Sequence, residues 1–184
     1  MRFVRAAAIA AVVAFAGSIA GIAAANAASI AVGKKLELKV NPKDIGQEQA
    51  QLWKRFGGWC ALKDWHPAVV SCHESTENGS QVRVLTLKDG SKIKEKLLDK
   101  KPNFYRYEML ESQLPVKNYQ AQFSLVPDDD DEDELNFSWS ATFDANGKTN
   151  KEARDVIDGI FKAGLDNIKM MVGKNVAGDD DDKK

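Results

Sequence analysis

The last long segment of the chain, residues 149–173, repeats apolar side chains at the period of a helix. Thr149 followed three residues later by Glu152 is a capping box, which begins a helix, and Gly173 is typical of a C-terminal cap. A helix with an unbroken apolar stripe must bury it against a second layer, and this requirement constrains the fold most strongly. The stripe consists of Ala153, Val156, Ile157, Ile160, Phe161, Gly164, Leu165, Ile168, Met171 and Val172.

Segments in which apolar and polar residues alternate, as in half-buried strands, predict the second layer. One of them, residues 36–40, precedes two short helical patterns at residues 44–56 and 59–65. Six more follow, separated by turn residues as in one antiparallel sheet. The order predicts an α+β fold in which a bent antiparallel sheet of about seven strands grips the long C-terminal helix. The six segments are residues 68–73, 81–88, 91–98, 104–112, 119–127 and 135–144.

Asp89-Gly90 predicts a β-hairpin with a two-residue loop, because both positions tolerate positive φ. Pairing outward from this loop places Glu95 on the apolar inner face. A buried carboxylate needs a partner or a raised pKa, which is one mark of a functional site, so Glu95 is a candidate polar anchor for a ligand. The alternatives are an ion pair with an inward Arg or Lys, and a position near the strand end that reaches water. The inner face of the hairpin is expected to hold Val82, Val84, Ile93, Glu95 and Leu97.

The first 27 residues predict a secretory signal peptide. Arg2 and Arg5 form a basic start, residues 6–22 are apolar and Ala-rich, and residues 25–27 (Ala-Asn-Ala) form a small-x-small cleavage site. No second long apolar run follows, so no stable membrane insertion is expected after cleavage. The mature protein is expected in the periplasm.

Two acidic runs interrupt the chain. Residues 128–134 are seven consecutive acids, and residues 179–182 are four more. Like charges repel and stay solvated, so we expect a turn at the first run and a disordered acidic tail at residues 176–184. Residues 28–175 then form one domain. The rest of the chain is mildly basic without interleaved aromatic residues, which gives no support to nucleic-acid binding.

Five segments together resemble one branch of a known superfamily. They are residues 59–69 (WCALKDWHPAV), 83–87 (RVLTL), 94–98 (KEKLL), 111–119 (ESQLPVKNY) and 160–165 (IFKAGL). With the order of elements, residues 36–173 resemble the MxaD-like branch of the SRPBCC superfamily, the START-like and plant-allergen-like polyketide cyclase/dehydrase and lipid transport proteins. The resemblance implies a helix-grip fold with an apolar cavity between sheet and helix. It also implies an accessory role in bacterial methanol oxidation, with a periplasmic dehydrogenase or cytochrome as partner, although the acidic runs are not part of the pattern.

Cys60 and Cys72 are the only cysteines of the chain. In an exported protein an even, minimal count favours one disulfide, which would stabilise the fold by ~3 kcal/mol in the chain-entropy model. The alternative is a metal site that includes His66 and His73. Their spacing matches no common zinc pattern, and an oxidising compartment removes the thiolates. We therefore predict the disulfide and no metal site.

His66, between Trp65 and Pro67, is a candidate acid/base group at the mouth of the cavity. No Ser or second carboxylate accompanies it at a suggestive spacing, although Asp64 is near in the sequence. We favour a structural histidine that closes the turn and donates a hydrogen bond to a backbone carbonyl.

Aromatic side chains gather on the inner face of the predicted sheet, where they would line an apolar pocket. Core packing explains many of them, but buried Tyr and Trp need hydrogen-bond partners, so several polar tips on one face favour a cavity. The expected ligand-binding cavity is lined by Trp53, Trp65, His66, Val84, Glu95, Tyr105, Tyr107, Tyr119, Phe123, Phe137, Trp139, Ile157 and Phe161.

These observations favour an exported, non-enzymatic protein that binds a small hydrophobic ligand, assists a periplasmic dehydrogenase, or does both. The first alternative is a cyclase/dehydratase-type enzyme that uses Glu95 or His66 as general acid/base. The second is a protein-binding adaptor without a ligand, whose acidic run at residues 128–134 docks on a basic partner. No cofactor is expected, because the sequence has no Gly-rich phosphate loop and no nucleophile elbow.

Overall fold

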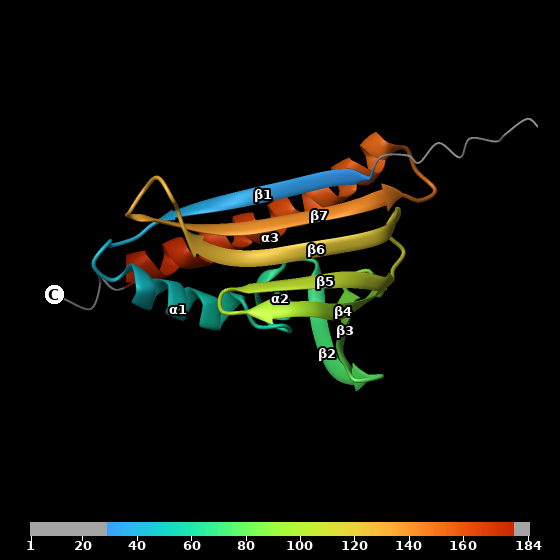
Figure 1. Ribbon diagram of the computed structural model, residues 1–184, viewed down its shortest axis with the longest axis horizontal. Coiled ribbons are helices and arrows are strands. Elements are labelled where there is room, and N and C mark those ends of the chain that lie inside the picture. The colour runs from blue at the N-terminus through green and yellow to red at the C-terminus, as the bar shows by residue number, and fades with distance from the viewer. Residues whose placement is uncertain (1–28, 179–184) are drawn as a thin grey trace, which may run out of the picture.

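A computed structural model describes residues 29–178 and shows two layers, a seven-stranded antiparallel sheet and helices that cover one of its faces (Figure 1). The strand order is β1-β7-β6-β5-β4-β3-β2, and α3 packs along β1 and β7. The predicted α+β helix-grip architecture is therefore confirmed. The elements are β1 (Ile30–Lys39), α1 (Ile45–Phe56), α2 (Leu62–Trp65), β2 (Val69–Glu77), β3 (Ser80–Leu87), β4 (Lys92–Lys101), β5 (Phe104–Glu111), β6 (Val116–Pro127), β7 (Glu134–Ala145) and α3 (Asn150–Gly178).

Some boundaries differ from the prediction. β1 begins six residues earlier than expected, because Ile30 already pairs with Phe143 of β7. The sequence from Ile30 to Leu36 does not alternate cleanly between apolar and polar residues, so the alternation rule did not predict this part of the strand. α3 continues through Gly173, which is not its C-terminal cap. The predicted signal peptide lies outside the described residues, as does the predicted tail beyond Gly178. Within the described part of the chain, no helix is long and apolar enough to span a membrane.

The capping box at the start of α3 is confirmed. The Glu152 backbone N–H donates to Thr149 Oγ1 at 3.2 Å, and the Thr149 backbone N–H donates to Glu152 Oε2 at 2.9 Å. These bonds satisfy donors that the first helical turn leaves free. Most of the stripe that follows faces the sheet, although Val156 is exposed. Six of its members are buried: Ala153, Ile157, Phe161, Gly164, Leu165 and Ile168.

The hairpin between β3 and β4 has a different register from the predicted one. The Leu87 backbone N–H donates to the Ser91 carbonyl, so the loop contains three residues rather than two, with Gly90 at φ +82°. This is the usual three-residue loop, in which a left-handed residue follows a turn. The extra loop residue shifts the pairing of β3 with β4 by one residue, which exchanges the two faces of β3. Arg83 therefore lies opposite Glu95 on the inner face. Val82 and Val84, predicted to face inward, lie opposite Lys96 and Lys94 on the other face.

Candidate functional site

A small cavity of about 60 Å³ lies between α3 and the inner face of the sheet. Ile157 and Phe161 of α3 form one wall, and side chains of β2 to β7 form the other. Of the residues predicted to line it, the structure places around the cavity His66, Glu95, Tyr107, Tyr119, Trp139, Ile157 and Phe161.

The other predicted lining residues lie elsewhere. Trp53 and Trp65 stack on Phe123 with ring centroids 5.9 and 5.5 Å apart, and Phe123 stacks on Phe137. These rings fill the core below α1 and α2, so the cavity occupies only the remaining part of the helix–sheet interface. The cavity is not lined by the other six residues of that prediction: Trp53, Trp65, Val84, Tyr105, Phe123 and Phe137.

Mostly aliphatic side chains, which the prediction missed, complete the cavity wall. Ile160 in the helical stripe and Ile93 in the alternating strand had a detectable signal, because both patterns place them inward. Ala68 and Leu114 lie in connections, where no periodicity indicates the direction of a side chain. The missed lining residues are Leu62, Ala68, Val69, Leu85, Leu87, Ile93, Met109, Leu114 and Ile160.

The polar groups in the cavity wall bond to other groups of the protein. Trp139 Nε1–H donates to the Tyr107 hydroxyl oxygen at 2.9 Å. Burial raises the pKa of Tyr107 and Tyr119 above the usual value, so the hydroxyls stay neutral. Because the Trp139 indole N–H and the Tyr107 hydroxyl already have each other as partners, an apolar group can pack against them without breaking that hydrogen bond.

Glu95 faces inward as predicted, and its partner is a buried arginine that the sequence analysis did not identify. Arg83 Nε donates to Glu95 Oε2 at 2.6 Å, Arg83 Nη1 donates to the Trp59 carbonyl, and the guanidinium lies 3.8 Å from the Trp59 ring centroid. Burial raises the pKa of Glu95, and Arg83 opposes this rise. Burial lowers the pKa of Arg83, but the charge of Glu95, the nearby Tyr105 and Tyr107 and the hydrogen bond to Glu95 together outweigh burial and raise the pKa above its usual value, so the guanidinium stays protonated. The alternative of an ion pair with an inward Arg is therefore correct.

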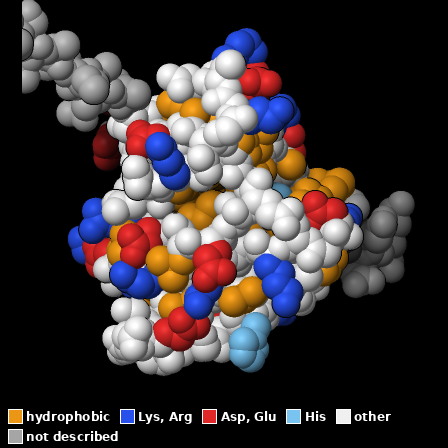
Figure 2. All heavy atoms as spheres, turned by 90° about the vertical axis from the view of Figure 1, so that its right-hand side faces the viewer, with side chains coloured by type: hydrophobic (Ala, Val, Ile, Leu, Met, Phe, Trp, Pro, Cys, Tyr) orange, Lys and Arg blue, Asp and Glu red, His pale blue; other side chains and the backbone are white. Residues whose placement is uncertain are grey.

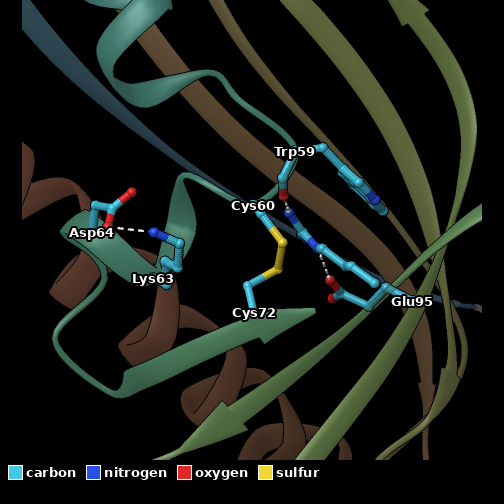
Figure 3. Close-up of a disulfide and its surroundings, with 7 residues drawn as sticks. Trp59, Cys60, Lys63, Asp64, Cys72 and Glu95 are labelled. Carbon is cyan, nitrogen blue, oxygen red and sulfur yellow. Dashed lines mark hydrogen bonds and ion pairs between the residues drawn. A yellow bond between two sulfur atoms is a disulfide. The ribbon is translucent and has the colours of Figure 1, made fainter. Parts of the chain in front are cut away.

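The predicted disulfide between Cys60 and Cys72 is confirmed, with the two Cα atoms 5.6 Å apart. It joins the segment before α2 to β2, and Figure 3 shows it next to Trp59 and the Glu95 carboxylate. The disulfide therefore holds the backbone whose carbonyl accepts a hydrogen bond from Arg83. Among residues 29–178, no group of three or more His, Cys, Asp or Glu residues is arranged to hold a metal ion.

Both ring nitrogens of His66 are engaged by the backbone. Nε2 lies 3.0 Å from the Ile160 carbonyl oxygen, and Nδ1 accepts the Ala68 N–H at 3.2 Å. A carbonyl can only accept, so Nε2 carries the proton and the ring is neutral. Burial lowers the pKa of His66, which keeps it neutral. His66 thus ties the turn before β2 to the middle of α3, as the structural interpretation predicted.

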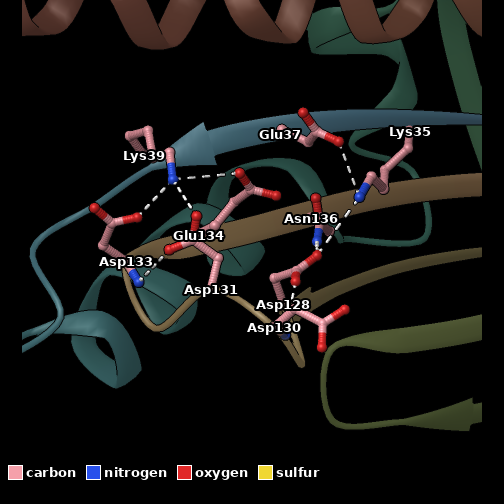
Figure 4. Close-up of polar contacts among 9 residues, drawn as sticks. All are labelled: Lys35, Glu37, Lys39, Asp128, Asp130, Asp131, Asp133, Glu134 and Asn136. Atoms are coloured by element: carbon pink, nitrogen blue, oxygen red, sulfur yellow. Dashed lines mark hydrogen bonds and ion pairs between the residues drawn. The ribbon is translucent and has the colours of Figure 1, made fainter.

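The first acidic run forms the turn between β6 and β7, as predicted, but β1 neutralises part of its charge (Figure 4). Lys39 Nζ lies 2.5 Å from Asp131 Oδ2 and 2.7 Å from Asp133 Oδ1, and these hydrogen bonds raise the pKa of Lys39. Lys35 Nζ lies 3.5 Å from Asp128 Oδ2. The sequence could not predict these pairs, because they depend on β1 lying beside β7.

Comparison with solved structures finds the same fold in several proteins. Over 77% of this chain and 94% of the other, XoxI from Bacillus cereus superposes with a TM-score of 0.64 and 25% identity. The ZhuI aromatase/cyclase from Streptomyces sp. R1128 matches 80% of this chain and 96% of its own, with a TM-score of 0.59 and 14% identity. Norcoclaurine synthase from Thalictrum flavum matches 78% and 86%, with a TM-score of 0.53 and 20% identity. At these identities the last two show the fold alone.

Sequence comparison identifies the family. No curated protein sequence matches the chain. The family described as polyketide cyclase/dehydrase and lipid transport matches residues 41–172, which include strands β2 to β7, the cavity and most of α3. This match agrees with the helix-grip fold and with the cavity between helix and sheet. The chain therefore belongs to the polyketide cyclase/dehydrase and lipid transport family.

Proposed function

We propose that this protein binds a small, mainly apolar molecule in the cavity between α3 and the sheet, and that it does so without catalysis. The observation that carries this proposal is the cavity itself, which lies between two largely apolar layers and whose polar groups Glu95, His66, Tyr107 and Trp139 have hydrogen-bond partners within the protein. Such a wall favours burial of hydrocarbon, worth about 0.8 kcal/mol for each methylene group transferred from water. Membership in a family that includes lipid transport agrees with this function.

Two features support binding rather than acid/base catalysis. His66 uses both ring nitrogens in backbone hydrogen bonds, so neither is free to exchange a proton with a ligand. Glu95 forms a buried ion pair with Arg83, which holds the carboxylate against the wall. A general acid or base must reach the proton that it transfers, and these contacts occupy the two best candidates.

The same proposal places the protein in the periplasm. The disulfide between Cys60 and Cys72 is typical of an oxidising compartment, and the predicted signal peptide would direct export. A role in assisting a periplasmic dehydrogenase rests on the resemblance to the MxaD-like branch. In that role the bound molecule would be the feature that the partner recognises.

Linear primary alcohols test the cavity. We expect ethanol, propanol and butanol to shift the indole N–H resonance of Trp139 in a saturable way, because this group lies in the cavity wall. Each added methylene should tighten binding about fourfold, or ~0.8 kcal/mol, until the cavity is full. The measurement is a two-dimensional ¹H–¹⁵N NMR titration of the four tryptophan indoles.

A pair of variants makes this test specific. Ala68 lines the cavity, so Ala68→Leu should fill it and abolish the saturable shift. Ala163 lies on the exposed face of α3, so Ala163→Leu adds the same atoms outside the cavity and should leave the titration unchanged. The proposal is wrong if the shift grows without saturation, or if Ala68→Leu binds the alcohols as well as the wild type does.

A further inference from the structure

The sheet opens between β5 and β6. Their pairing ends where Glu108 lies opposite Gln120, and in the described chain it does not resume toward the connecting loop. Beyond that pair, β5 stays paired with β4 through Glu111, and β6 stays paired with β7 from Val116 onward. β6 also bulges here, with Asn118 at φ +52°. We call this opening the β5–β6 seam.

A hollow of about 640 Å³ lies in the seam. It is lined by residues of the two diverging strands and of the connections at their ends, among them Ser112, Lys117, Asn118 and Asn146. Backbone N–H and C=O groups that leave a sheet ladder remain free to bond a ligand. Figure 2, which views this end of the molecule, shows hydrophobic side chains exposed between charged ones.

Two side chains separate the hollow from the inner cavity. Met109 and Tyr119 line both of them, and Leu114, in the loop that joins β5 to β6, lines the inner one. Met is unbranched and adapts its shape readily, so Met109 is suited to move aside. The two spaces are therefore adjacent and share these two lining residues.

The inner cavity alone is smaller than most small-molecule sites, whereas the adjacent hollow in the seam is of the usual size. Small-molecule sites commonly enclose about 300–1,000 Å³, a range that the seam hollow meets and the inner cavity of about 60 Å³ does not. The inner wall is apolar, whereas the seam offers hydrogen-bonding groups. Its charged side chains are of both signs, Glu108 and Glu111 against Lys117, so the seam favours an uncharged polar group.

We propose that the ligand is amphipathic, with its apolar end in the inner cavity and an uncharged hydrogen-bonding head, such as a hydroxyl or amide, in the β5–β6 seam. The chain of the ligand passes between Met109 and Tyr119. This inference rests on the proposed binding function and adds to it the route through the sheet and the chemistry of the head group.

A thiol placed in the seam tests this route. Cys60 and Cys72 are the only cysteines and form a disulfide, so Lys117→Cys introduces the one reactive thiol. Before labelling, octanol should bind more tightly than butanol. After the thiol reacts with a pyrenyl maleimide, the Kd for octanol should rise at least ~10-fold, because the label fills the seam, while the Kd for butanol should change less than ~2-fold. Titration of the Trp139 indole resonance measures both.

Lys148→Cys is the matched control, because Lys148 is exposed in the turn before α3 and lies outside both spaces. The labelled control should bind both alcohols as before. If labelled Lys117→Cys binds octanol with an unchanged Kd, the proposed route through the β5–β6 seam is wrong. The same conclusion follows if the label weakens the binding of octanol and butanol equally. Absence of butanol binding in the unlabelled wild type would instead overturn the proposed function, so the two failures are distinct.

Discussion

Replacement of Arg83 by Met will lower the free energy of unfolding by about 3–5 kcal/mol, the usual cost of removing one partner of a buried ion pair. Arg83 is 1% exposed and Glu95 is 4% exposed, so water cannot solvate the carboxylate that remains. The substitution also removes the hydrogen bond to the Trp59 carbonyl and the contact with the Trp59 ring. Urea unfolding at neutral pH, followed by circular dichroism, measures the loss.

Two further variants show whether the unpaired charge is responsible. In the double variant Arg83→Met/Glu95→Leu no charge is left buried, so most of the lost stability should return. Lys96→Met breaks a partly exposed ion pair in which Lys96 Nζ also lies 2.6 Å from a carboxylate oxygen, Glu108 Oε1. This variant should lower the free energy of unfolding much less than Arg83→Met does. A loss in Arg83→Met no greater than that in Lys96→Met would contradict this account of the buried pair.

Replacement of both Cys60 and Cys72 by Ala will lower the free energy of unfolding by ~3 kcal/mol. The bridge joins residues 12 apart, and a loop of this length restricts the unfolded chain by about that amount. Urea unfolding compares the double variant with the oxidised wild type.

A reducing agent supplies the control for the cysteine variant. Reduction should shift the unfolding midpoint of the wild type toward that of the double variant, and it should leave the double variant unchanged, because the chain has no other cysteine. Equal midpoints for the oxidised wild type and the variant would mean that the disulfide adds nothing to stability.

Periodicity predicted most of the fold. The stripe of α3 and the alternation in β6 and β7 each identify a buried face without tertiary information, so the helix-grip layers could be predicted. The length of the β3–β4 loop could not be, because Asp89-Gly90 suits both a two-residue and a three-residue loop. That single residue decided whether Val84 or Arg83 faced the core.

The cavity was harder to predict than the layers, because alternation assigns a side chain to a face but not to a position along the helix. Phe123 and Trp139 both point inward, yet only Trp139 reaches the cavity. Phe123 packs against the Trp53 ring of α1 and the Trp65 ring of α2, and no local pattern indicates where these helices dock. Glu95 was identified because a carboxylate among inward apolar residues violates the pattern.

The most direct test of the account is native mass spectrometry of the protein purified gently from its own cells, followed by denaturing mass spectrometry of the same sample. We predict that the wild type holds a small molecule whose mass is lost on denaturation, and that Ala68→Leu, purified in the same way, lacks it. A wild-type protein with the mass of the bare polypeptide, or the same bound mass in Ala68→Leu, would contradict the claim that the cavity is a binding site.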